Sequence, residues 1–362
     1  MLKIQSSDYL LLRIAGTSIF RWLGNRETAF LRSELSSIEI VKPIFITGLA
    51  RAGTTLLLEL FSTVNGFASH RYRDFPFLTV PYLWNQYLNL ASKEQEPVER
   101  AHQDRILVTR ESPEAFEEPL WQAFFPQAHL ASAVHRLDES VVNPEFEQFF
   151  RNHIRKLLCI RNGSRYISKG NYNVSRIEYL ARLFPDARFV IAIRDPMTQV
   201  HSLVRQHQLF SDYAALDARV PRYLAAAGHF EFGPQRVPIR FDAEPENRIL
   251  NAWSRGEEYL GYAMQWTDVY RFVDSLRRAS PQIADRMLVV RYEDLCADPA
   301  GTVRTILSHI QVVEDEAANV FSQLDEISKS EHRPQINETT QSELRAEIEP
   351  VARVFGYDTE PN

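Results

Sequence analysis

The stretch IFITGLARAGTTLLLELF, residues 44–61, decides the fold of this chain. Its first four residues form an apolar run typical of a buried strand, and residues 56–61 have the apolar character of a helix start. A glycine-containing turn at residues 48–55 joins the two. A strand that leads through such a turn into a helix presents backbone N–H groups and the positive end of the helix to a phosphate. The sequence therefore predicts a phosphate-binding loop here.

Four more apolar runs have strand character, at residues 66–70, 165–168, 188–193 and 287–292. Helical patterns separate several of these runs, and this alternation is typical of a parallel sheet covered by helices on both faces. We therefore expect an α/β fold, a P-loop-like three-layer sandwich with a central parallel sheet of about five strands. Ligands of such folds bind at the carboxyl edge of the sheet.

Two long stretches do not follow the strand–helix alternation. Residues 78–160 are rich in aromatic residues and proline, with helical patterns expected at 82–90, 98–109 and 146–158. Residues 208–250 hold four prolines and many charges, which predict a loop or lid before a helical stretch at 248–276. We expect both stretches to be substrate-side insertions, with helical parts, that cap the carboxyl edge of the sheet. A single domain of residues 1–362 would then include them.

The first 40 residues are expected to form an N-terminal helical segment. Its apolar residues recur at helical spacing, at Leu12, Ala15, Ile19, Trp22 and Leu23. A helix docked on the body of the protein is one interpretation, and an in-plane membrane anchor is the other. Arg13 and Arg21 interrupt the apolar run before an export signal or a membrane span is complete, so we expect neither.

The composition excludes several classes of protein. The 362 residues include 41 basic and 47 acidic ones, a net charge of −6 that argues against a nucleic-acid coat or a polybasic membrane patch. The two cysteines, Cys159 and Cys296, are far apart and have no second Cys or His at metal-ligand spacing. We therefore expect neither a disulfide framework nor a metal site, and a reducing, cytoplasmic location fits best.

The glycines of the loop have the spacing of a Walker A motif, but the lysine of that motif is missing. Thr54 stands where the lysine would reach the β- and γ-phosphates of ATP, which disfavours phosphoryl transfer. Arg51 supplies a cation inside the turn instead. We expect a 5′-phosphate and its attached group to be bound by the backbone and side chains of Arg51, Ala52, Gly53, Thr54 and Thr55. An ordinary strand-to-helix turn is the alternative.

A second cluster follows the apolar run at 188–193. Arg194 stands at the carboxyl end of that run, toward the expected ligand crevice, and Ser202 comes eight residues later on the next helix. Together they predict a site for a second phosphate, and a surface ion pair of Arg194 with Asp195 is the alternative. Tyr292 ends the run at 287–292 and is a candidate to lie against a purine ring, with a core or solvated role as its alternative.

At these residues the chain resembles the sulfotransferases that use 3′-phosphoadenosine 5′-phosphosulfate. Residues 51–55 resemble their 5′-phosphosulfate loop, Arg194 with Ser202 resembles their 3′-phosphate motif, and RYEDL at 291–295 is similar to a later strand end. The layout resembles the bacterial and Golgi-type branch, which includes the tyrosylprotein sulfotransferases, and lacks the late R-K-G-x-x-G loop of the cytosolic steroid and phenol enzymes. The resemblance implies in-line sulfuryl transfer from this nucleotide without a metal.

Lys169 ends the segment RYISK at 165–169 and is one of only six lysines in the chain. The resemblance implies that Lys169, with Arg51, lies near the bridging or sulfuryl oxygens of the donor and stabilises the leaving group. A simple exposed lysine is the alternative. The late pair Ser328 and Lys329 resembles a segment that closes over the nucleotide in the tyrosylprotein branch.

A hydroxyl acceptor needs a base to take its proton, and the resemblance implies a base just past the second predicted strand. Asp74 is the candidate there, with His70 as its rival, and a salt-bridged loop aspartate is the alternative. Glu118, beside the aromatic residues at 121–125, is a reserve candidate for the base. The segment from Ser112 to Glu114 looks like a helix start, so plain capping is the alternative role of the acidic group Glu111, Glu114, Glu117 and Glu118.

We therefore expect an enzyme, a sulfotransferase that uses this nucleotide and modifies a hydroxyl of a small molecule, lipid or glycan. One alternative is a small-molecule kinase on the same scaffold, which Thr54 disfavours. The other is a non-catalytic protein that binds adenosine bisphosphate. The sequence does not identify the acceptor.

Overall fold

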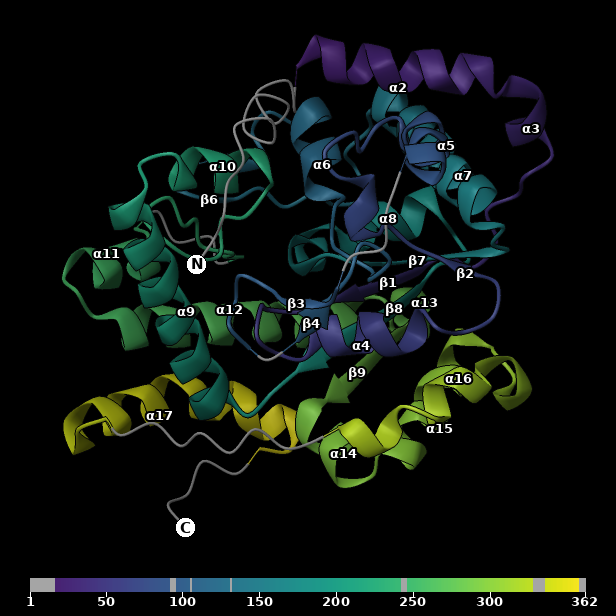
Figure 1. The fold of residues 1–362 in the computed structure, drawn as a ribbon. Coiled ribbons are helices and arrows are strands. Elements are labelled where there is room, and N and C mark those ends of the chain that lie inside the picture. Colours follow the sequence, from purple (N-terminus) through teal and green to yellow (C-terminus); the bar gives the residue numbers. More distant parts are fainter. Residues whose placement is uncertain are drawn as a thin grey trace.

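A five-stranded parallel sheet lies at the centre of the molecule, in the order β2-β7-β1-β8-β9 (Figure 1). The computed structural model describes residues 17–91, 96–104, 106–130, 132–241, 246–327 and 336–357. The strands of the sheet are β1 (Ile44–Thr47), β2 (Phe67–Ala68), β7 (Arg165–Lys169), β8 (Arg188–Ile193) and β9 (Met287–Arg291). They coincide with the five apolar runs of the sequence, so the predicted sheet is confirmed.

Helices connect these strands and cover the sheet. Their bounds are α2 (Ser18–Phe30), α3 (Arg32–Ser36), α4 (Thr54–Phe61), α5 (Pro81–Ala91), α6 (Glu118–Phe124), α7 (Pro144–Arg161), α8 (Ile177–Leu183), α9 (Pro196–Leu216), α10 (Val220–Ala226), α11 (Arg248–Ser254), α12 (Glu258–Ala279), α13 (Pro281–Ala284), α14 (Tyr292–Ala297), α15 (Pro299–Ile310), α16 (Ala318–Phe321) and α17 (Glu338–Ala352). Two short antiparallel hairpins are formed by β3 (Val98–Glu99) with β4 (Leu107–Val108), and by β5 (His129–Leu130) with β6 (Ala133–Val134).

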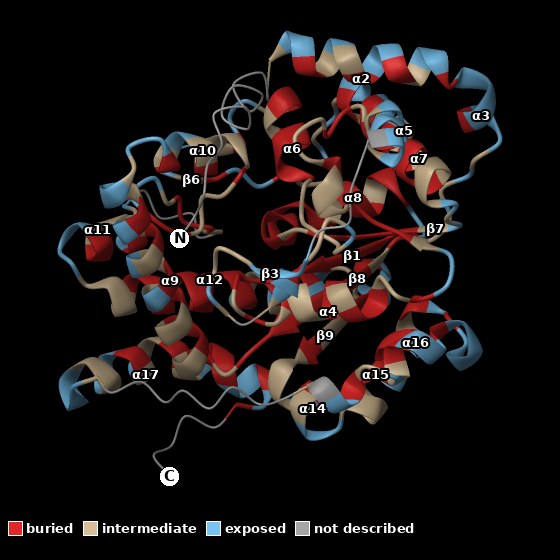
Figure 2. Cartoon of the chain, in the orientation of Figure 1, coloured by how far each residue is buried: buried red, intermediate tan, exposed pale blue. Residues whose placement is uncertain are grey.

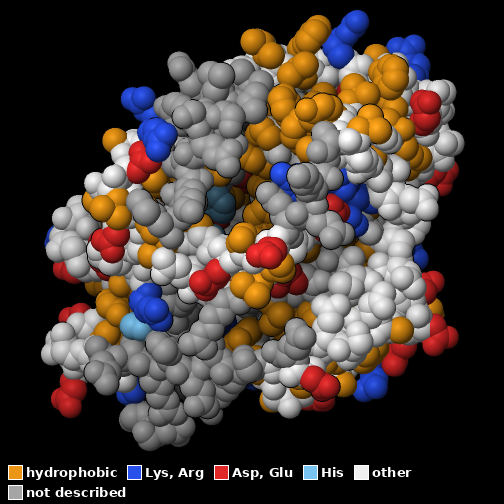
Figure 3. Space-filling model, in the orientation of Figure 1, with side chains coloured by type: hydrophobic (Ala, Val, Ile, Leu, Met, Phe, Trp, Pro, Cys, Tyr) orange, Lys and Arg blue, Asp and Glu red, His pale blue; other side chains and the backbone are white. Residues whose placement is uncertain are grey.

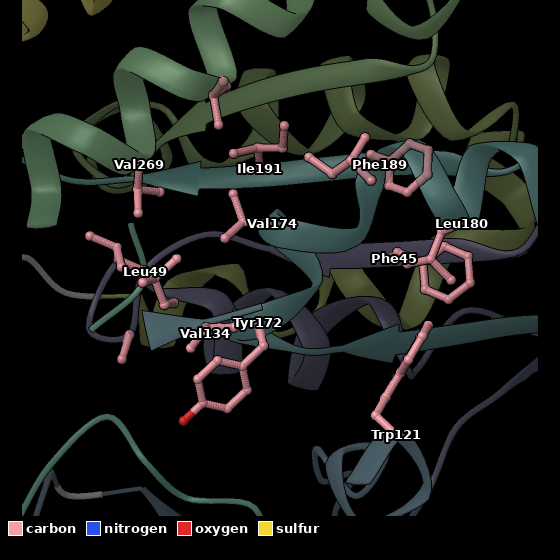
Figure 4. Close-up of a cluster of buried hydrophobic side chains, with 14 of the residues drawn as sticks. Phe45, Leu49, Trp121, Val134, Tyr172, Val174, Leu180, Phe189, Ile191 and Val269 are labelled. Carbon is pink, nitrogen blue, oxygen red and sulfur yellow. The ribbon is translucent and has the colours of Figure 1, made fainter. Parts of the chain in front are cut away.

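Alternate side chains of the central strands enter two separate cores. Phe45 of β1 belongs to one core, whereas its neighbours Ile44 and Ile46 belong to the other, as the period of two along a strand requires. The first core packs the sheet against α7, α8 and α12, and the second packs it against α4 and α15. Figure 2 shows the buried sheet between these helices, and Figure 4 shows Phe45 and Phe189 of the sheet with Leu180 of α8. The predicted three-layer sandwich is confirmed.

The insertion at residues 78–160 contains α5, both hairpins, α6 and most of α7. The helices expected at 82–90 and 146–158 are present as α5 and α7, but the prediction of a helix at 98–109 is wrong. That segment is the β3–β4 hairpin, because Gln103 takes a left-handed backbone angle, φ 49°, that a helix cannot contain.

The stretch expected to be a loop or lid at 208–250 is helical in its first half. Helix α9 continues to Leu216, and α10 follows it directly. Helices α11 and α12 then form the helical stretch expected at 248–276.

The N-terminal helix docks through a different face from the predicted one. Phe20, Gly24 and Glu27 of α2 are buried, whereas Ile19 and Trp22 are 54% and 58% exposed. Leu12 and Ala15 lie outside the described residues. Figure 3 shows hydrophobic side chains gathered on the surface where α2 and α5 lie, and their exposed large apolar residues are Ile19, Trp22, Phe30, Leu83, Tyr87 and Leu90. In the described part of the chain, no helix combines the length and the apolar character that crossing a membrane requires.

A buried ion pair explains this choice of face. The Nζ atom of Lys156, on α7, lies 3.3 Å from Glu27 Oε2, and both side chains are almost fully buried. Lys156 also donates to the carbonyl oxygens of Gly24 and Thr79, and Glu27 accepts a hydrogen bond from the Leu83 amide. Burial raises the pKa of Glu27 and lowers the pKa of Lys156 to about 8, because each charge has left water. The pair joins α2, α5 and α7.

Replacing Lys156 with Met should lower the free energy of unfolding by about 3–5 kcal/mol, because it leaves the Glu27 carboxylate buried without its cation. The double variant Glu27→Leu with Lys156→Met should recover most of this loss. Urea denaturation of the four proteins of this cycle is the measurement. A single variant within about 1 kcal/mol of the wild type would show that the pair does not hold α2 in place.

Candidate active site

The turn between β1 and α4 contains three residues with left-handed backbone angles. They are Gly48, Arg51 and Gly53, at φ 127°, 71° and 94°. A Cβ atom on Gly48 would lie 2.3 Å from the carbonyl oxygen of Ala192, so only glycine lets the loop pass the end of β8. The first amides of α4 have no carbonyl partner within the helix and are available to an anion.

The three sequence motifs meet at this turn. The ring of Tyr292 lies beside Gly53, where an added Cβ would be 2.9 Å from Tyr292 Cδ2. The guanidinium carbon of Arg194 lies 4.5 Å from the centre of the same ring. Arg51 donates from Nε to the hydroxyl of Ser202, 3.1 Å away. The predicted nucleotide residues before position 300 are therefore brought together, whereas Ser328 and Lys329 lie outside the described residues.

The structure gives Ser202 and Asp195 specific hydrogen-bond partners. Ser202, which is predicted to share a phosphate with Arg194, accepts a hydrogen bond from Arg51. Asp195 caps α9 by accepting hydrogen bonds from the amide and hydroxyl of Thr198, and its own amide donates to Glu293. Asp195 therefore has a capping role at the start of α9.

Lys169 lies at the same edge of the sheet as the loop. It ends β7 opposite Ile46 of β1, and its side chain is buried. Burial lowers the pKa of Lys169, while the nearby carboxylate of Glu114 acts in the opposite direction. Two residues on, Asn171 accepts a hydrogen bond from the Thr54 hydroxyl and donates one to Glu231. The strand end of β7 is thus tied directly to the loop, and the alternative of a simple exposed lysine is wrong.

Two carboxyl groups accompany Lys169. Glu114 accepts hydrogen bonds from the Tyr72 hydroxyl and the Ala115 amide. Burial opposes its ionisation, but the positive charges of Lys169 and Arg100 hold the pKa of Glu114 below its ordinary value. Glu59, one turn along α4 from the loop, has its pKa raised to about 7, mainly by burial. The sequence pattern indicated only a capping role for Glu114 and no role for Glu59.

Asp74 and His70, the predicted base and its rival, belong to a different, fully enclosed network. Asp74 accepts hydrogen bonds from Asn85 and Arg161 on one oxygen, and from the Arg71 amide and His70 on the other. The second ring nitrogen of His70 lies 2.8 Å from Nε2 of His153. Burial favours the neutral form of Asp74, but His70 and Arg161 hold the pKa of this carboxyl well below its usual range. This environment argues against either residue as the base.

Glu118, the reserve candidate, has a similar structural role. Its two oxygens accept hydrogen bonds from the guanidinium of Arg176, at 2.8 and 2.6 Å, and Nε2 of His129 lies 2.6 Å from one of them. The helix start predicted at Ser112 is wrong, because α6 begins at Glu118 itself. Glu118 therefore holds α6 against the 3₁₀ helix Asn171–Arg176 and has no oxygen without a partner.

Arg100 and Asp104 are site residues that sequence reasoning missed. Arg100 donates from Nη1 to the Thr55 hydroxyl at 3.3 Å, and its other nitrogens bind Asp104 at 2.9 and 2.6 Å. Asp104 also accepts a hydrogen bond from Arg51 at 2.8 Å. In the helix expected at 98–109 these two residues would have formed an ordinary surface pair one turn apart. Nothing in their spacing pointed to the loop.

Comparison with known proteins agrees with this arrangement of motifs. A profile described as the sulfotransferase family matches residues 43–238, more than half of the chain. The chain belongs to the sulfotransferase family. The matched range includes the loop, Lys169, Arg194 and Ser202, and ends before Tyr292.

The chain is also similar to individual proteins. The sulfotransferase is 22% identical to protein-tyrosine sulfotransferase 1 of Danio rerio over 185 residues, which are 50% of this chain and 40% of that protein. The chain thus spans about two fifths of the length of this curated relative. Its fold is similar to that of sulfotransferase STF9 from Mycobacterium avium, with TM-score 0.51, 15% identity, and 94% of this chain and 84% of that chain covered. Sulfotransferase STF1 from Mycobacterium tuberculosis superposes with TM-score 0.49 at 16% identity over 90% of this chain and 81% of that one.

The variant Asp74→Asn should destabilise the sulfotransferase by about 3–5 kcal/mol at pH 7, because it leaves the buried Arg161 without its carboxylate. Folding lowers the pKa of Asp74, so its stabilising effect is present above the unfolded value of about 3.9 and is lost as the pH falls further. In urea denaturation, the difference in the free energy of unfolding between wild type and variant should therefore become smaller between about pH 4 and pH 3. Unchanged stability together with lost turnover would contradict this role and restore Asp74 as the base.

Proposed function

We propose that this sulfotransferase transfers a sulfuryl group from 3′-phosphoadenosine 5′-phosphosulfate to a hydroxyl of a small molecule, lipid or glycan. One observation carries the proposal: Arg194 stacks on Tyr292, and Tyr292 lies against Gly53 of the loop. A cation for a second phosphate is thereby held next to a loop suited to a first one. A nucleotide that carries phosphates on both the 3′ and 5′ positions matches two anion sites this close together.

The residues around the loop suit the two ends of such a nucleotide. The amides at the start of α4, the Thr55 hydroxyl and the Arg51 guanidinium would bind the 5′-phosphosulfate. Arg194 would bind the 3′-phosphate, and the Tyr292 ring offers an apolar face beside it. Thr54, where a kinase loop has lysine, donates its hydroxyl hydrogen to Asn171, which supports sulfuryl transfer over the kinase alternative.

Lys169 and Arg51 have the charge that the reaction needs. In-line transfer leaves negative charge on the oxygen that bridges the sulfuryl group and the 5′-phosphate, and fixed cations stabilise it. Lys169 is the last residue of β7 and is shielded from water, so its charge acts with little screening. We assign both side chains to stabilisation of the leaving group.

We assign the proton acceptor to Glu114 in place of Asp74. Glu114 is the charged group that acts most strongly on Lys169, and Tyr72 orients one of its oxygens. A hydroxyl that approaches the sulfuryl group beside Lys169 would come within reach of this carboxylate. Each oxygen of Asp74 accepts two hydrogen bonds, and His70 lies between Asp74 and His153. Glu118 is bound by Arg176 and His129. Each oxygen of Glu114 accepts one hydrogen bond, which leaves a lone pair for the proton of an acceptor.

Binding of adenosine 3′,5′-bisphosphate in excess chelator tests the donor site. Arg194→Ala should weaken the binding of this ligand by about 2–4 kcal/mol and the binding of adenosine 5′-phosphate far less, because only the bisphosphate carries the 3′-phosphate that Arg194 would bind. Arg278→Ala, an exposed arginine of α12, is the matched control. Isothermal calorimetry is the measurement. Binding of ATP with magnesium in place of the bisphosphate would support the kinase alternative.

Turnover with labelled sulfate tests the assignment of the base. Glu114→Gln should lower kcat by about 10²–10⁴-fold while the affinity for adenosine 3′,5′-bisphosphate changes little. Glu111→Gln is the control, since Glu111 lies three residues away on the surface, paired with Arg71 and Arg73. A Glu114→Gln enzyme with kcat within about threefold of wild type would contradict the assignment and direct the same test to Glu59. A wild type that binds the nucleotide without any turnover would favour the non-catalytic alternative.

A further inference from the structure

The β3–β4 hairpin places a carboxylate on the cations of the donor loop. Asp104 Oδ2 accepts hydrogen bonds from Arg51 Nη1 at 2.8 Å and Arg100 Nη2 at 2.6 Å, and its Oδ1 accepts one from Arg100 Nε at 2.9 Å. The side chains of Asp104 and Arg100 are only 10% and 8% exposed. Three N–H groups from two arginines thus converge on one shielded anion.

The same arginines border the position proposed for the 5′ end of the donor. Arg100 donates to Thr55, the second residue of α4, and Arg51 belongs to the loop itself. We propose that Asp104 competes internally with the 5′ anion of the donor for Arg51 and Arg100, and that Arg100 is a further donor-binding residue. This inference rests on the proposed function.

Electrostatics makes the carboxylate a competitor. Burial opposes the ionisation of Asp104, but Arg100 and Arg51 hold its pKa well below the ordinary value, so the group stays charged. A second anion between Arg51, Arg100 and Thr55 would meet that charge at short range with little solvent to screen it. Nucleotide binding therefore requires Asp104 to give up at least one arginine. A ligand group that replaces Asp104 must offer the arginines more negative charge than a single carboxylate does. This requirement favours a 5′ end that carries several charges.

The hairpin is anchored so that the Asp104 side chain can turn away without moving the backbone. His102 Nδ1 lies 2.9 Å from Gln206 Oε1, and Gln206 donates back to the carbonyl of His102. Gln103 donates to the hydroxyl of Tyr213. Gln206 and Tyr213 belong to α9, the helix that also carries Ser202, the hydroxyl partner of Arg51. The hairpin therefore does not depend on the Asp104–Arg51 contact for its position.

Two ligands that differ only at the 5′ end test the proposal. Asp104→Asn keeps the shape of the side chain and removes its charge. By calorimetry it should bind adenosine 3′,5′-bisphosphate on the order of tenfold more tightly than wild type does, with adenosine 3′-phosphate unchanged within about twofold. Arg100→Gln should weaken the binding of the bisphosphate by a similar factor and again leave the affinity for adenosine 3′-phosphate unchanged. Asp274→Asn removes the partner of Arg278 on α12, a surface pair of the same spacing, and is the control.

The other outcomes overturn one specific statement each. Weaker binding of the bisphosphate by Asp104→Asn would mean that Asp104 positions the two arginines for the donor, and would refute the competition. An equal change for both ligands, or no change for either, would show that Asp104 does not act at the 5′ end. A wild-type protein that binds neither nucleotide would contradict the proposed function itself. Thermal unfolding of each variant distinguishes these results from misfolding.

Discussion

The close approach of the loop to its neighbours, without intervening Cβ atoms, is the constraint on which the site depends. At Gly48 the loop touches the backbone of β8, and at Gly53 it touches the ring of Tyr292. These contacts join three segments that are about 140 and 100 residues apart in sequence. With a larger residue at either position, the loop would be pushed away from Ala192 or from Tyr292. Glycine is therefore a packing requirement here as well as a conformational one.

Five of the carboxylates described above fall into two groups that differ in their cations. Asp74, Glu118 and Glu27 are each matched by a basic side chain that lies away from the loop: Arg161, Arg176 and Lys156. Asp104 and Glu114 share the influence of Arg100, and each acts on a cation of the proposed donor site. The first group maintains the scaffold, because its cations lie away from the proposed donor site. The second group can exchange its partners for those of a ligand.

The sequence predicted the sheet and the loop because both depend on local patterns. Continuous apolar runs identify strands that are buried on both faces, and the spacing of Gly48 and Gly53 identifies the turn between β1 and α4. The environment of Asp74 was beyond such patterns. The role of Asp74 depends on Arg161 and, through His70, on His153, both supplied by α7 about 80 residues later, and the hairpin depends on the backbone angle of Gln103. Those contacts are decided by tertiary packing, which a single sequence does not display.

The ion pair of Glu27 and Lys156 also bears on the order in which the chain can fold. Lys156 bonds the carbonyl of Gly24 across 132 residues, so α2 leaves the ribosome long before the helix that receives it. Until α7 forms, Phe20 and Glu27 on the buried face of α2 lack the helix against which they pack. Contacts of such large sequence separation slow folding, because a long loop must close before they form. Docking of the first described helix is thus a late event, completed only after the middle of the chain has been synthesised.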